Sequence, residues 1–198
     1  ILARTALWLE GFEEGRPLSF LDHHLQVGDA LLGLTSLHCL EHGIAKDAFK
    51  PLSGDDKEVC KALAKENTAA LKQLSTERKS RQARLELEDT HGLTQLKAIE
   101  ALPEGSTVEI AAKAHAYAEY LQTARTSNLA AAADALLGAY LLPKTEAKDT
   151  AIPTTSTLVL TLQGSALQAG QQAALAAAQA ACRYARVFHW PLAFPQVF

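Results

Sequence analysis

The chain has 198 residues, of which 48% are hydrophobic and 21% charged, and its formal net charge is −3. This length suffices for one domain with a substantial apolar core, and the acidic balance argues against nucleic-acid binding over the whole surface. Three scattered cysteines without CxxC spacing and the lack of an apolar run of membrane-spanning length favour a reducing, cytoplasmic location without a membrane.

The first ten residues predict a helix. Apolar side chains occur nearly all round residues 1–10, which indicates the buried end of a helix, and Gly11 ends it. Because the chain starts at Ile1 inside this helix, we expect it to be an internal piece of a longer protein. A short strand is expected around Leu25–Val27, ending at a turn that contains Asp29.

The central part of the chain predicts long helices. Residues 57–102 are rich in strong helix formers, and Asp55 or Asp56 is expected to cap their start. After a turn at Pro103–Ser106, apolar residues recur at steps of three and four up to Leu142, which is typical of a helix packed on another helix. The simplest arrangement is a long antiparallel helical hairpin.

The last quarter predicts one more helix. Residues 144–157 are polar and indicate a linker, and residues 165–187 predict an Ala-rich helix whose small side chains allow close packing. The tail at 188–198 is rich in aromatic residues, so we expect it to be extended and packed against the rest of the chain.

Two short motifs have the letters of metal sites. His38, Glu41 and His42 spell H-x-x-E-H, the signature of inverted zinc peptidases, and Asp22-His23-His24 resembles the D-H-H of metal-dependent phosphoesterases. The peptidase needs a third ligand from a second helix, and the phosphoesterase needs several further aspartates. Neither set is present at motif-like spacing and short motifs match by chance, so we predict no metal.

The most basic run of the chain lies in the predicted long helix. Its cations are weak candidates for contact with DNA phosphates: Arg78, Lys79, Arg81 and Arg84. Neighbouring carboxylates between residues 77 and 89 favour the simpler interpretation of a solvated helix face.

Three segments together resemble one family. Residues 3–33 read ARTALWLEGFEEGRPLSFLDHHLQVGDALLG, residues 43–57 read GIAKDAFKPLSGDDK, and residues 188–198 read FHWPLAFPQVF. In this order they resemble parts of large restriction-modification and BREX-type DNA adenine methylases that use S-adenosylmethionine. In that family the first segment follows the motif for the cofactor ribose, and the last precedes the strand with the catalytic Asn-Pro-Pro-Tyr/Trp. Gln196 stands where the family usually has Glu.

The resemblance implies a doubly wound α/β methyltransferase domain that is interrupted by a helical insert. Residues 1–42 would be the edge of its core, with a helix, a short strand and the Asp29 turn. Residues 43–143 would be the helical hairpin insert, and residues 144–198 the linker, Ala-rich helix and aromatic tail that return to the core. The expected fold class is therefore mainly α, a long antiparallel helical hairpin or bundle with one or two short strands of the interrupted domain.

The resemblance also implies a function. Asp29 matches the acidic position near the cofactor's adenine, where a carboxylate can accept a hydrogen bond from the exocyclic amine; a turn-forming Asp after a strand is an equally good interpretation. The parent protein would transfer a methyl group from S-adenosylmethionine to adenine N6 in double-stranded DNA, with partner subunits of a defence system. The glycine-rich loop and the Asn-Pro-Pro motif would lie outside this chain, so we expect no catalytic residue in it. The alternative is a non-catalytic helical module that docks a partner subunit or DNA.

Overall fold

The structure is a computed structural model, and it describes residues 2–12, 14, 17, 19–80, 90–146 and 151–198. The described residues are mainly helical, as expected from the composition, and they contain no strand. The elements in chain order are α1 (Leu2–Glu10), η1 (Leu37–His42), η2 (Lys46–Phe49), α2 (Lys57–Ser80), α3 (Thr90–Glu100), α4 (Thr107–Arg125), α5 (Asn128–Leu141), α6 (Thr155–Leu162), α7 (Ala169–Tyr184) and α8 (Trp190–Ala193).

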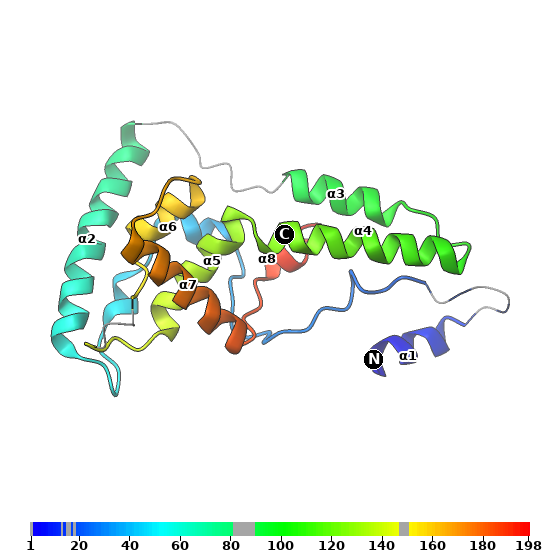
Figure 1. Cartoon of the computed structure of the whole chain (residues 1–198), viewed down its shortest axis with the longest axis horizontal. Helices are drawn as coiled ribbons and strands as arrows, with labels where there is room; N and C mark the ends of the chain where they lie inside the picture. Colours follow the sequence, from blue (N-terminus) through cyan, green and yellow to red (C-terminus); the bar gives the residue numbers. More distant parts are fainter. Residues whose placement is uncertain (1, 13, 15–16, 18, 81–89, 147–150) are drawn as a thin grey trace.

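Helix α5 is the centre of the main helical body. It packs along α7 and α6, and α2 lies on the outer side of α6 (Figure 1). Small side chains make the α5–α7 contact close: a Cβ on Gly138 would lie 2.3 Å from the Cβ of Ala178. The expected close packing of the Ala-rich helix is therefore confirmed, and this helix spans Ala169–Tyr184.

The short 3-10 helices η1 and η2 close one side of this body. Leu40, Ile44 and Phe49 are almost fully buried and contribute to the same apolar core as Leu158 of α6. Helix α2 begins at Lys57, and Asp56 directly before it caps it, because its Oδ1 accepts the N–H groups of Glu58 and Val59 at 2.7 and 3.0 Å. The expected cap at the start of this helix is thus present.

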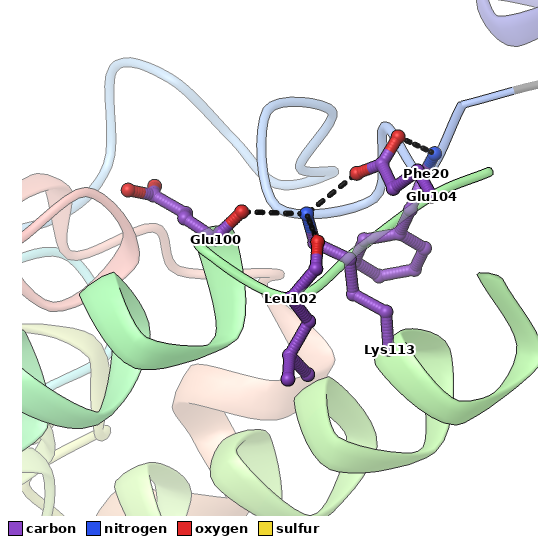
Figure 2. A network of polar contacts seen from close by, with 5 residues as sticks. All are labelled: Phe20, Glu100, Leu102, Glu104 and Lys113. Atoms are coloured by element: carbon purple, nitrogen blue, oxygen red, sulfur yellow. Dashed lines mark hydrogen bonds and ion pairs between the residues drawn. The ribbon is translucent and has the colours of Figure 1, made fainter. Parts of the chain in front are cut away.

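Helices α3 and α4 form a second, smaller apolar cluster with the N-terminal segment. The buried Lys113 joins the parts, because its Nζ donates to Glu100 O at 2.8 Å, to Leu102 O at 3.4 Å and to Glu104 Oε1 at 2.5 Å (Figure 2). The other oxygen of Glu104 accepts the backbone N–H of Phe20 at 3.3 Å. The ammonium group of Lys113 therefore satisfies two carbonyl groups at the end of α3. Through Glu104 it also fixes the position of Phe20 in the N-terminal segment.

The expected long antiparallel hairpin is present only in part. Helix α3 pairs with α4, whereas α2 packs against η2 and α6 (Figure 1). The second predicted helix is also divided, because α4 ends at Arg125 and Ser127 caps the start of α5 by accepting the N–H of Ala130 at 3.1 Å. An apolar stripe predicts that a helix packs against another element. It does not predict which element, because many helices present a similar apolar surface.

Four further expectations are corrected. No strand forms at Leu25–Val27, because a strand needs a partner and the described chain offers only the single parallel bridge of Asp29 with Val187. Helix α1 has no buried residue. The polar linker at 144–157 contains the start of α6, and the tail after residue 187 forms the short α8 instead of a fully extended segment.

None of the helices that the structure describes is long and apolar enough to cross a membrane.

Candidate functional site

Two segments from opposite ends of the chain lie side by side. The backbone N–H of Asp29 donates to Arg186 O at 2.8 Å, and Asp29 forms a parallel bridge with Val187. Further along, the N–H of Phe188 donates to Leu32 O at 2.8 Å, and the N–H of Trp190 donates to Leu34 O at 3.0 Å. We call the contact between residues 28–34 and 186–190 the clasp.

Two glycines allow the clasp to close. A Cβ on Gly28 would lie 2.5 Å from the ring of Phe188, and a Cβ on Gly33 would lie 1.9 Å from the carbonyl oxygen of Phe188. Both distances are far below van der Waals contact, so any side chain at Gly33 would push the two backbones apart. The ring of Phe188 also meets Trp190 edge to face, with centroids 5.0 Å apart.

His189 anchors the clasp to the helical body. Its Nδ1 accepts the backbone N–H of Leu34 at 3.2 Å, and its Nε2 lies 3.2 Å from Asp134 Oδ1 on α5. Because an N–H already points at Nδ1, the proton of the neutral ring belongs on Nε2, where it donates to the carboxylate. Sequence reasoning missed this pair, and no local signal connects two residues 55 positions apart.

Asp29 is exposed at the edge of the clasp. Its Oδ1 accepts the backbone N–H of Leu31 at 3.0 Å, and its carbonyl oxygen accepts the N–H of Leu32 at 3.2 Å. This is the geometry of a turn-forming aspartate. Contact of this carboxylate with a cofactor stays a prediction.

A pocket of about 330 Å³ adjoins the clasp. It lies between the ends of α4 and α7, with α5 and α8 as further walls, and three arginines line it: Arg125, Arg183 and Arg186. The buried Cys182 also lines the pocket, and burial and the nearby Asp134 raise the pKa of its thiol. Cys182 is therefore a neutral thiol at physiological pH and is not an activated nucleophile.

The basic run of the sequence lies elsewhere. Arg78 and Lys79 belong to the last turn of α2, and Arg81 and Arg84 lie outside the described residues. Their contact with DNA stays a prediction.

The two metal-like motifs have other contacts. His38 is exposed on the 3-10 helix η1 and its Nδ1 lies 3.0 Å from Glu41 Oε1. A 3-10 helix has three residues per turn, so residues four apart, such as His38 and His42, lie on different faces. His23 is buried and stacks on Phe20, and burial together with the neighbouring His24 lowers its pKa. In the described part of the chain, no group of three or more metal-ligating side chains comes together.

Comparisons with family models, curated proteins and solved structures find no match to this chain. The methyltransferase resemblance therefore rests on the three peptides themselves.

Proposed function

We propose that this chain is part of an S-adenosylmethionine-dependent DNA methyltransferase that methylates adenine N6 in restriction-modification or phage defence. The chain itself does not carry the catalytic motif. The observation that supports the proposal is the clasp. The peptides at 3–33 and 188–198, which carry the resemblance, touch each other, because the N–H of Phe188 donates to Leu32 O at 2.8 Å.

This neighbourhood is the one that the proposed enzyme needs. In doubly wound α/β folds, ligands bind at the carboxyl ends of adjacent strands, so the segment near the cofactor and the segment that leads to the catalytic motif must be close. The parallel bridge between Asp29 and Val187 is compatible with such a pair of strands. In this proposal the exposed carboxylate of Asp29 accepts a hydrogen bond from the amine of the cofactor's adenine.

The proposed enzyme acts on double-stranded DNA in the cytoplasm. The most basic run of the sequence contributes contacts with the DNA backbone, which strengthen binding without reading the base sequence. It is formed by Arg78, Lys79, Arg81 and Arg84.

Methylation of host DNA tests this proposal. The complete gene is expressed in a host without adenine methylation, and N6-methyladenine is measured by mass spectrometry of digested DNA. We expect methylation with the native gene and at least a tenfold loss, roughly one missing hydrogen bond to a charged group, with Asp29→Ala. Asp47→Ala, which changes an exposed aspartate far from the clasp, is the control. No methylation with the native gene overturns the proposal.

A second function is favoured by helix α1. Its apolar side chains are largely uncovered, with Leu2 87% and Leu9 65% exposed, and Phe12 just beyond it is 59% exposed. Such a surface is typical of a site that docks another protein. A non-catalytic module that docks a partner subunit is therefore the alternative. A stable complex that Leu2→Glu and Leu9→Glu disrupt, in cells whose DNA carries no N6-methyladenine, would favour this module over the enzyme.

A further inference from the structure

The pocket beside the clasp has the size and the charge of a site for a small anion. Its volume of about 330 Å³ is within the range of pockets that hold small organic molecules. Arg125 ends α4, Arg183 lies in the last turn of α7, and Arg186 lies just beyond the capping residue of that helix, Ala185. Three cationic groups from two elements thus line one pocket in a chain whose net charge is −3.

These arginines have no carboxylate partner within the part of the chain that the structure describes. No carboxylate of the residues that the structure describes lies within ion-pair distance of Arg125, Arg183 or Arg186. One carboxylate lines the pocket, that of Asp134, and it is held by His189 at 3.2 Å. The lining side chains therefore carry three positive charges against one negative charge.

The partial negative charges at the carboxyl ends of α4 and α7 do not cancel the excess positive charge at the pocket. Each helix carries a partial charge of about −0.5 at its carboxyl end, and α4 and α7 both end at the pocket. The two ends together supply about −1 against a side-chain excess of +2. A positive potential remains, and it attracts an anion.

The backbone at Arg186 is a second, independent observation. Arg186 has a φ of 53°, in the left-handed region, and it follows Ala185, the residue that caps the end of α7. Glycine is the usual residue at this position, because a side chain there strains the backbone. Strained residues that a fold retains are concentrated at functional sites. The N–H of Val187 closes this helix end by donating to Cys182 O at 2.9 Å, and an arginine in place of the usual glycine keeps a cation beside the pocket.

We propose that this pocket binds a small phosphate ester of about the size of a mononucleotide. The guanidinium groups of Arg125, Arg183 and Arg186 hold the phosphate, for which their planar donors are well suited. The apolar side chains of Val27 and Leu121 lie on the wall of the same pocket and contact the organic part. This proposal does not depend on methyl transfer.

Calorimetry on the whole chain at low ionic strength tests the proposal. The probes are adenosine monophosphate and ribose 5-phosphate, with adenosine as the probe that lacks phosphate. We expect either phosphate ester to bind, and Arg183→Ala or Arg186→Gly to weaken binding by about tenfold or more. Arg186→Gly keeps or raises the thermal midpoint, because glycine removes the backbone strain, so a loss of binding cannot be attributed to unfolding. Lys65→Ala, which removes an exposed cation on α2, leaves binding unchanged.

Three results would overturn the proposal. Binding of adenosine as tightly as its monophosphate would remove the role of the phosphate. Binding of a short DNA duplex through the same arginines, with no binding of either small ester, would make the pocket part of a nucleic-acid surface. Failure of all probes at millimolar concentration would leave the arginines without a ligand of this class.

Discussion

Asn67 of α2 accepts two hydrogen bonds from Thr155 at the start of α6. Its Oδ1 accepts the backbone N–H at 2.8 Å and the hydroxyl at 2.7 Å, and its Nδ2 donates to Ile44 O at 2.8 Å. The same hydroxyl accepts the N–H of Ile44 at 3.0 Å. All three residues are fully buried. The groups satisfy one another, so the network joins three segments without leaving a buried polar group unpaired.

Asn67→Ala is expected to lower the free energy of unfolding by about 3 kcal/mol, since it leaves several buried polar groups of Thr155 and Ile44 unsatisfied. Urea unfolding followed by circular dichroism measures the change. Gln122→Ala on the exposed face of α4 is the control and should change stability by less than about 0.5 kcal/mol. A loss as small as the control's would show that the network does not hold α2 to α6.

Gly138→Ala is expected to destabilise the protein by about 1–3 kcal/mol, although alanine is the better helix former. The added methyl group would lie 2.3 Å from Ala178 Cβ, so α5 and α7 must move apart. Gly170→Ala is the matched control in α7, because a Cβ there meets nothing within 4 Å. Thermal unfolding should show opposite shifts: a lower midpoint for the first variant and an equal or higher midpoint for the second.

Glu104→Gln is expected to destabilise the protein at neutral pH and much less in acid. Burial disfavours the charged carboxylate, but the hydrogen bond and charge of Lys113 outweigh it and hold the pKa of Glu104 below its usual value of 4.5. A carboxyl group whose pKa is lower in the folded state than in the unfolded state stabilises the fold at pH values above its unfolded pKa. This stabilisation is lost as the pH falls through the folded-state pKa.

Urea unfolding of both proteins at pH 7, 5 and 3 measures this effect. The difference between Glu104→Gln and the native chain should be similar at pH 7 and 5 and should shrink at pH 3. Glu119→Gln, at an exposed position of α4, should show little difference at any of these pH values. A difference for Glu104→Gln that grows in acid would mean that Lys113 does not stabilise the carboxylate.

Gly33→Ala is expected to open the clasp, because its methyl group would lie 1.9 Å from the carbonyl oxygen of Phe188. Trp190 reports this change, since its Nε1 donates to Ala30 O at 3.1 Å in the closed clasp. In a Trp8→Phe background Trp190 is the remaining tryptophan. Its emission should shift to longer wavelength and iodide should quench it more strongly, whereas Gly170→Ala should leave both unchanged.

The helices with a local signal were predictable from the sequence. Asp56 caps α2, the turn before α4 contains proline and glycine, and the alanines of α7 indicate close packing. Helix α6 had no such signal, because its sequence TSTLVLTL is rich in β-branched residues that favour strands. Its first backbone N–H is instead satisfied by Asn67, which lies 88 residues earlier. Sequence periodicity cannot show a cap that comes from another helix.

The clasp and the pocket were predictable only in part. The glycines and the aromatic tail could be recognised in the sequence, and the expectation that the tail packs against the chain is confirmed by the contacts of Phe188 and Trp190. The pairing of His189 with Asp134 depends on how α5 and α7 pack. The three arginines come from the ends of two helices, so only the folded chain brings them to one pocket.

The clasp brings together the two ends of the segment that forms the helical body. The chain enters the helical body after the first segment of the clasp and comes back to it at the second. There the N–H of Phe188 donates to Leu32 O at 2.8 Å, so the two ends of the body are adjacent. A segment whose two ends are adjacent behaves as an insertion, which can be exchanged, lengthened or removed while the flanking backbone keeps its course. Chimeras that replace residues 35–185 with a short turn or a foreign domain should therefore keep both segments of the clasp, 28–34 and 186–190, as the junctions.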